Sequence, residues 1–198
     1  MALLVGLGNP GRRYARTRHN AAWRLVERLR ARWAAQPVET RQADAPYRAW
    51  RAEREGRSVV LLAPLTFMNR SGEALAAWGS EHGLERAELL VVVDDVYLPL
   101  GELRLRARGS SGGHRGLESL EAMLGDREYA RLRIGVGAPE SSAALKEHVL
   151  EEFDPKDEEV VEQAIERAAD AVECWLARGL LAAMNEFNRS TRKEEPKP

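Results

Sequence analysis

The sequence of 198 residues contains one cysteine, Cys174. A single cysteine forms no disulfide within the chain and no multi-cysteine metal site, which is typical of proteins from a reducing compartment. Because Cys174 lies in a helical pattern, we interpret it as a packing residue and not as a nucleophile.

Long apolar runs are also missing. No run approaches the roughly 20 apolar residues that span a bilayer, and the N-terminus has no basic region ahead of a long apolar one. Internal repeats, low-complexity linkers and metal-ligand spacings of His, Cys, Asp and Glu are absent as well. We therefore expect one soluble, cytoplasmic domain over residues 1–190, followed by a disordered charged tail at 191–198.

The net charge is close to zero, at −1, but the charges are unevenly distributed along the chain. Residues 12–54 contain twelve arginines and four acids, whereas residues 151–170 contain nine acids and two basic residues. Such a bipolar chain either presents one basic face to a polyanion or carries ordinary solvated charges. Composition alone leaves both interpretations open.

Strand-like and helix-like segments alternate along the sequence, which predicts an α/β sandwich: a single domain with a twisted, mixed, mostly parallel sheet covered by helices. Residues 138–153 have the pattern of a loop with a short helix, and we expect them to form a mobile lid. The strands are expected at 2–7, 47–50, 58–63, 89–93, 101–108 and 132–137, and the helices at 20–33, 71–82, 116–124, 154–179 and 180–187.

Polar side chains follow the buried strands at the edge where open α/β sheets usually bind ligands. Asn9 and Asn69 each follow a strand, where an amide positions a substrate or simply forms a turn. His19 lies just before the first helical stripe, so it is a candidate general base, and Asp94 is the best placed carboxylate to orient it. The neighbouring Asp95 leaves that choice ambiguous from spacing alone.

Two familiar motifs fit poorly. Residues 6–11 match G-x-G-x-x-G, but Pro10 removes a backbone donor, the helix does not open at Gly11, and the expected acid falls inside the first helix. Ser110 and Ser111 lie in a glycine-rich loop without the G-x-S-x-G pattern, so a serine nucleophile is disfavoured.

One predicted strand, at 101–108, alternates apolar residues with arginines and therefore has one apolar and one basic face. Its three arginines and one more on the next strand are the expected partners of nucleic-acid phosphates. These residues are Arg104, Arg106, Arg108 and Arg133.

Five stretches together resemble the bacterial peptidyl-tRNA hydrolase family. They occur in the family's order: VGLGNPG at 5–11 with Tyr14 and TRHN at 17–20, PLTFMNRSG at 64–72, VDDVYLPLG at 93–101, GSSGGHRG at 109–116 and RLRIGVG at 131–137. Five co-linear motifs are far more specific than any one of them.

The resemblance implies hydrolysis of the ester between a peptide and the 3′-terminal ribose of tRNA, which frees the tRNA for reuse in translation. It further implies that the enzyme needs no metal or cofactor. We also expect no membrane partner and a monomeric protein. His19 looks like the family's catalytic base and Asp94 its orienting carboxylate. Substrate contacts are implied for Asn9, Tyr14, Met68 and Asn69.

Arg115 departs from the family, which usually has an asparagine there that helps to hold substrate and water. An arginine keeps hydrogen-bond donors but loses the carbonyl acceptor and adds a charge. We expect Arg115 to contact the substrate, with a phosphate group as an alternative partner.

Two functions of other classes remain as alternatives. A non-catalytic RNA-binding relative would be expected to lose His19 or Asp94, and both are present. A small-molecule hydrolase or nucleotide-binding protein is disfavoured by the arginine-rich strand and by the absence of a phosphate loop.

Overall fold

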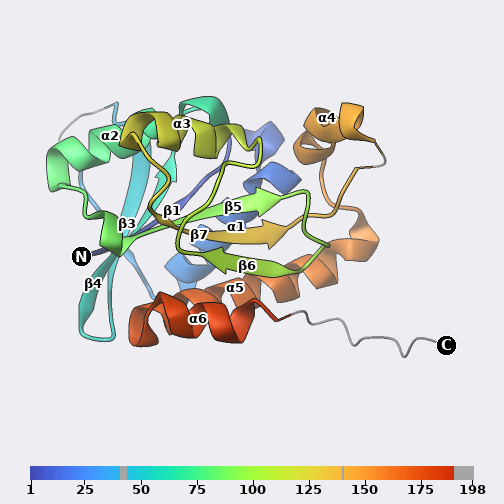
Figure 1. The fold of residues 1–198 in the computed structure, drawn as a ribbon. Coiled ribbons are helices and arrows are strands. Elements are labelled where there is room, and N and C mark those ends of the chain that lie inside the picture. The colour runs from blue at the N-terminus through green and yellow to red at the C-terminus, as the bar shows by residue number, and fades with distance from the viewer. Residues whose placement is uncertain (41–43, 140, 190–198) are drawn as a thin grey trace.

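The computed structural model describes residues 1–40, 44–139 and 141–189, which form a mixed seven-stranded sheet flanked by helices. The strand order is β2-β3-β4-β1-β5-β7-β6. The predicted tail at 191–198 lies outside the described residues. Figure 1 shows the strands as a twisted layer with helices on both sides.

The four central strands are parallel to one another. They are β4 (Arg57–Pro64), β1 (Ala2–Gly6), β5 (Leu89–Asp95) and β7 (Ala130–Gly135). The outer strands are antiparallel to their neighbours: β3 (Tyr47–Arg54) and the short β2 (Gln36–Pro37) at one edge, β6 (Leu103–Arg106) at the other. The predicted mixed sheet with a parallel core is confirmed.

Both faces of the sheet are buried, because the side chains of a strand alternate between them. Leu3 and Val5 of β1 face one core with α2 (Ser71–His82) and α3 (Arg115–Leu124), whereas Ala2 and Leu4 face the other. That second core is covered by α1 (Ala21–Arg32), α5 (Glu158–Arg178) and α6 (Leu180–Phe187). A short helix, α4 (Leu145–Leu150), lies near the ends of β5 and β7 (Figure 1).

The element boundaries follow the expected stop and start signals in most places. Gly83 ends α2 with a φ of 78°, and the Asp154 side chain accepts the backbone N–H of Lys156 at the 3₁₀ turn that leads into α5. The strand predicted at 101–108 is shorter, because Gly101 turns with a φ of 84° and the pairing with β7 ends at Arg106. The short edge strand β2 is not among the predicted strands, because its two residues have no strand pattern in the sequence.

The glycines after β1 allow a close approach of strand and helix. A Cβ atom on Gly6 would lie 2.5 Å from Cγ2 of Val26 and 2.9 Å from the carbonyl oxygen of Ala22, both in α1. A Cβ on Gly8 would lie 2.6 Å from the ring of Trp23. These glycines therefore serve helix–strand packing, and the G-x-G-x-x-G spacing has a structural explanation without a nucleotide.

Many of the arginines in the basic segment form ion pairs with acids of the acidic segment, because α1 and α5 pack side by side. Arg28 donates to Glu162 at 2.6 Å and also pairs with Glu166, and Arg32 lies 2.8 Å from Asp170. Arg24 continues the row with Glu158 and Glu162. The basic segment and the acidic segment thus form an ionic ladder between two helices, and much of the predicted basic face is neutralised there.

None of the helices in the part of the chain that the structure describes is long and apolar enough to cross a membrane.

We expect Arg28→Gln to reduce the free energy of unfolding by about 0.5–1 kcal/mol at low salt, because partly exposed ion pairs contribute about 0.2–1 kcal/mol each. The loss should shrink in about 1 M NaCl, where the Debye length is about 3 Å. Urea unfolding at both salt concentrations measures this. Arg51→Gln, on the exposed side of β3, is the control with no salt-dependent effect; equal losses in the two variants would contradict the ladder.

Candidate active site

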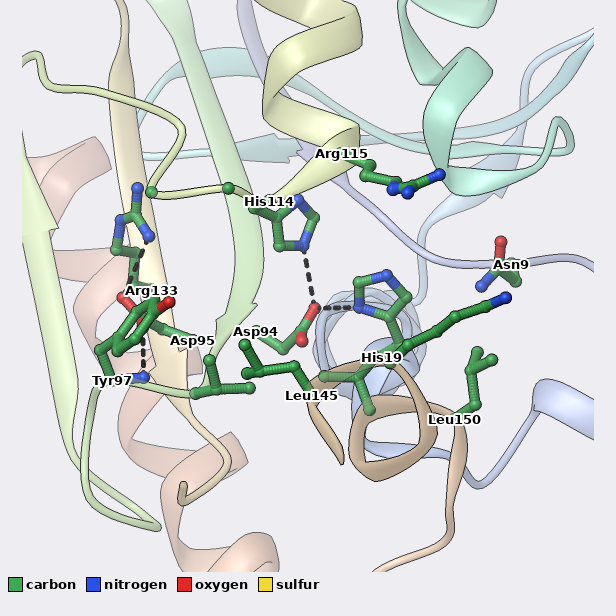
Figure 2. Close-up of a pocket in the computed structure, with 15 residues that line it drawn as sticks. Asn9, His19, Asp94, Asp95, Tyr97, His114, Arg115, Arg133, Leu145 and Leu150 are labelled. Atoms are coloured by element: carbon green, nitrogen blue, oxygen red, sulfur yellow. Dashed lines mark hydrogen bonds and ion pairs between the residues drawn. The ribbon is translucent and has the colours of Figure 1, made fainter. Parts of the chain in front are cut away.

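A pocket of about 340 Å³ opens beyond the C-terminal ends of the parallel strands. Its wall brings together the loop after β1, the end of β5, the glycine-rich loop before α3, and one face of α4 (Figure 2). This is the edge where the sequence predicts the polar groups. The lining includes Asn9, His19, Asp94, Asp95, Tyr97, His114, Arg115, Arg133, Leu145, Lys146, Val149 and Leu150.

The pair expected to carry the chemistry is in contact. His19 lies in a 3₁₀ turn, Arg18–Asn20, just before α1, and its Nδ1 is 2.8 Å from Oδ1 of Asp94. Since the carboxylate accepts, Nδ1 carries the proton and Nε2 is the free basic nitrogen of the neutral ring. The sequence separation of 75 residues gives no distance, so only the fold establishes this contact.

Burial and charge act against each other in this pair. Burial of His19 would lower its pKa, but the charge of Asp94 and the hydrogen bond to it outweigh burial and raise the pKa above 6.5. For Asp94, which is 2% exposed, burial would raise the pKa, but the two neighbouring histidines hold it far below its usual value. The Asp94 carboxylate is therefore ionised at neutral pH.

A second histidine binds the same carboxylate oxygen, and sequence reasoning did not identify it as a site residue. Nε2 of His114 lies 3.0 Å from Oδ1 of Asp94, and the two imidazole centroids are 5.0 Å apart. Figure 2 shows both rings pointing at Asp94, His19 from the turn before α1 and His114 from the start of α3. The signals in the sequence are the position of His114 between the glycine-rich loop and the predicted helix and its place in the GSSGGHRG motif at 109–116.

His19, Asp94 and His114 have ligand atoms within 4.8 Å of one another, a spacing compatible with a metal ion. The hydrogen bonds of His114 argue against one. Its Nδ1 accepts the backbone N–H groups of Gly116 and Leu117 at 3.2 and 3.3 Å, so the ring proton is on Nε2, where a metal would have to bind. The donor set does not fit a resident cation.

Asn9 is held so that its amide N–H groups face the pocket. Its Oδ1 accepts the backbone N–H of Met68 at 2.8 Å, which leaves Nδ2 as the free end. The backbone of Asn9 is clamped by the buried side chain of Asn20, which accepts from Asn9 N at 2.8 Å and donates to its carbonyl oxygen at 3.0 Å. Asn20 is thus a positioning residue that the sequence showed only within a motif.

Other predicted substrate residues lie around the pocket and not in its lining. Met68 is buried, between the Asn9 side chain and the start of α3, and Asn69 is exposed next to it. Tyr14 packs edge-to-face against the exposed ring of Phe67, with centroids 6.4 Å apart. Of these residues, Met68 contacts a lining residue, through its backbone hydrogen bond to Asn9.

The four predicted phosphate contacts fall into two groups. Arg104 and Arg106 are exposed on β6, and Arg108 is exposed just beyond it, 3.8 Å from Glu128. Arg133, by contrast, is largely buried: it pairs with Asp95 at 3.0 Å and donates to the carbonyl oxygens of Ser110 and Ser111. Arg133 therefore supports the glycine-rich loop that carries His114.

The predicted lid contains α4, which lines one side of the pocket. It is tied to the segment that carries His19: the backbone N–H of Arg18 donates to the carbonyl oxygen of Glu151 at 3.0 Å, and the Arg18 side chain donates to that of His148 at 3.2 Å. A loop and a short helix were predicted here, and the structure has both; the mobility of 138–153 stays a prediction.

Two cations border the pocket without an ion pair among the described residues: Arg115 at the start of α3 and Lys146 on α4. Figure 2 shows Arg115 extending toward the side where Asn9 lies. The two carboxylates of the pocket are already neutralised, Asp94 by its histidines and Asp95 by Arg133. The open part of the pocket therefore favours an anionic or electron-rich ligand.

Comparison with known proteins identifies close relatives. Residues 3–196 match the family described as peptidyl-tRNA hydrolase. The peptidyl-tRNA hydrolase of Symbiobacterium thermophilum is 47% identical over 186 residues, which cover 94% of this chain and 98% of that protein. That of Syntrophomonas wolfei is 44% identical over 188 residues, covering 95% and 100%. The crystal structure of peptidyl-tRNA hydrolase from Acinetobacter baumannii has a TM-score of 0.86 at 33% identity, covering 95% of this chain and 94% of that one.

We expect Asp94→Asn to lower the pKa of His19 below its native value, because burial then acts without the opposing carboxylate. In the native protein the raised pKa means that protonated His19 adds stability at pH below about 6.5, and that this stability is lost as the pH rises through the folded-state pKa. Over the same rise in pH, the free energy of unfolding of Asp94→Asn should fall by less than that of the native protein. NMR titration of the His19 ring and urea unfolding measure the two effects.

Asp95→Asn is the matched control, since it removes the same charge one residue away but from a carboxylate that pairs with Arg133. A His19 pKa that falls equally in both variants would show that general charge, and not the Asp94 contact, sets it.

Proposed function

This chain belongs to the peptidyl-tRNA hydrolase family, and we propose that it hydrolyses the ester between peptide and tRNA with His19 as general base. The observation that carries the proposal is the hydrogen bond of 2.8 Å between His19 and a buried Asp94 at the wall of an open pocket. A merely RNA-binding protein has no need of this oriented imidazole. The products are the free peptide and a tRNA that returns to translation.

The reaction requires a water molecule activated at neutral pH. Nε2 of His19 takes one proton from the water as its oxygen attacks the ester carbonyl carbon, and Asp94 stabilises the imidazolium that results. The tetrahedral intermediate then collapses, the bond between the carbonyl carbon and the 3′-oxygen of the ribose breaks, and that oxygen takes up the proton. One water molecule is consumed, and no redox step occurs.

The negative charge that develops on the ester carbonyl oxygen needs a hydrogen-bond donor. The free Nδ2 of Asn9 is held rigidly by the Met68 backbone and by Asn20, so it is ready before the substrate binds. Removing one such donor in other enzymes costs roughly 2.7–4 kcal/mol of activation free energy. We assign this role to Asn9, with Asn69 as a second amide that reaches the substrate from the rim.

The rest of the substrate lies across the pocket and its rim. In our proposal Tyr14 and Met68 flank the cleft, and Arg115 supplies hydrogen-bond donors and a positive charge where relatives usually have an amide. Arg115 has the reach to contact either the peptide or a nearby phosphate, because its side chain is exposed. We further propose that the chain acts as a monomer in the cytoplasm, without metal or cofactor.

The tRNA backbone needs a basic surface that is continuous with the pocket. Arg104 is the cross-strand partner of Arg133, and Arg106 is the partner of Arg131, so the exposed arginines of β6 lie beside the arginines of β7. We propose that Arg104, Arg106 and Arg108 bind phosphates directly. Arg133 borders this surface at the pocket wall, where it pairs with Asp95 and holds the glycine-rich loop.

We expect His19→Ala to slow single-turnover cleavage of a peptidyl-tRNA by about 10²–10⁴-fold, because a positioned base contributes about that factor. His82→Ala, which removes a histidine that stacks on Trp78 away from the pocket, should retain nearly the native rate. A His19→Ala protein that is folded and still cleaves at nearly the native rate would exclude the general-base proposal.

Replacement of Arg104 and Arg106 together by Gln should weaken tRNA binding and leave the rate at saturating substrate almost unchanged. The slope of log affinity against log salt should become less steep by about 1 for each phosphate contact that is lost. Arg51→Gln is the control, since β3 is separated from β6 by four strands. If the salt dependence of binding is unchanged in the double variant, the tRNA binds another face of the protein.

A further inference from the structure

One oxygen atom in the pocket accepts from two imidazoles. Oδ1 of Asp94 is 2.8 Å from Nδ1 of His19 and 3.0 Å from Nε2 of His114. His114 uses its other nitrogen at the N-terminus of α3, where Nδ1 accepts from the backbone N–H groups of Gly116 and Leu117. Its ring is thus held between a helix terminus and a carboxylate.

The helix terminus fixes the tautomer of His114. Since two backbone N–H groups point at Nδ1, this nitrogen is an acceptor, and the tautomer with the proton on Nδ1 is disfavoured. His114 therefore donates its Nε2 proton to Asp94. It differs from His19, whose exposed nitrogen is free to gain and lose a proton.

We propose that His114 is a positioning residue that, by sharing Oδ1 of Asp94, limits how strongly this carboxylate binds protonated His19 and so favours the unprotonated ring of His19. Two donors on one oxygen compete, because each withdraws electron density from the same acceptor. Loss of His114 leaves the whole of Oδ1 to His19 and favours the imidazolium. This inference rests on the proposed function only through the role of His19 as base.

The other charged groups around His19 do not account for this effect. Asp95 and Arg133 form an ion pair at 3.0 Å, and Arg18 turns toward α4, where it lies 3.6 Å from Glu151. Arg115 and Lys146 are positive and exposed, so they disfavour a second positive charge in the pocket and do not compete for Asp94. His114 is the one group that shares an acceptor with His19 among the described residues.

Two substitutions separate the two hydrogen bonds of His114. His114→Asn places an acceptor near the position of Nδ1, so it keeps the cap of α3 but is too short to reach Asp94. His114→Gln places an amide N–H near the position of Nε2, so it keeps a donor to Asp94 and loses the cap. The first variant tests the proposal, and the second is its matched control.

In His114→Asn the acidic limb of the profile of kcat/KM against pH should move up by about 0.5–1 pH unit, because a hydrogen bond of about 1 kcal/mol corresponds to about that shift. On the acidic side this reduces kcat/KM roughly threefold to tenfold, and the plateau at high pH should change little. His114→Gln should keep the native limb and lower the Tm. The proposal is overturned if the acidic limb of the His114→Asn profile stays in place or moves to lower pH. It is also overturned if kcat/KM falls by the same factor at every pH.

NMR of the histidine rings tests the same point without substrate. In His114→Asn the titration of His19 should move to higher pH, and in the native protein the ring proton of His114 should be on Nε2. A native His114 whose ring proton is on Nδ1, or a His19 titration that does not move in His114→Asn, overturns the proposal even if cleavage is observed. If instead the NMR results hold and the native enzyme does not cleave peptidyl-tRNA, only the proposed function fails.

Discussion

The carboxylate of Asp94 is the constraint on which the pocket depends. It is 2% exposed, and a buried charge is stable only when hydrogen bonds and opposite dipoles replace its water. Two histidines from distant parts of the chain supply those bonds, and each is in turn held by its own element: His19 by the turn before α1, His114 by the first turn of α3. Moving either element would remove one of these two hydrogen bonds, so the need to satisfy Asp94 also fixes the position of the His19 ring.

The parallel core of the sheet explains why these groups meet. β1, β5 and β7 end at the same edge, and the loop after each strand delivers one part of the site: Asn9 after β1, Asp94 at the end of β5, and the loop supported by Arg133 of β7. Glycines 6 and 8 allow α1 to approach β1 closely enough for the turn with His19 to reach β5. The site is thus built on rigid strand ends, and the hydrogen bonds within it are set before substrate arrives.

The charges of the molecule are divided between stability and binding. The arginines of α1 are largely paired with the acids of α5, whereas the arginines of β6 are exposed and two pocket cations, Arg115 and Lys146, have no ion pair among the described residues. Asn188 strengthens this arrangement at the edge, since its side chain donates to and accepts from the backbone of Leu105 and ties the end of α6 to β6. A near-neutral net charge therefore coexists with a localised basic region.

The sequence by itself determined the layer architecture, most element positions and the identity of His19, Asp94 and Asn9 as candidates, because hydrophobic periodicity, turn residues and five ordered motifs are local properties. Only the tertiary structure decided which acid contacts His19 and that His114 donates a second hydrogen bond to the same acid. The structure also decided that the Asn20 side chain holds the backbone of Asn9 and that Arg133 holds the glycine-rich loop. It also decided that the arginines near the N-terminus pair with α5. All of these depend on distances between residues far apart in the chain, which follow from strand order and helix packing and have no local pattern in the sequence.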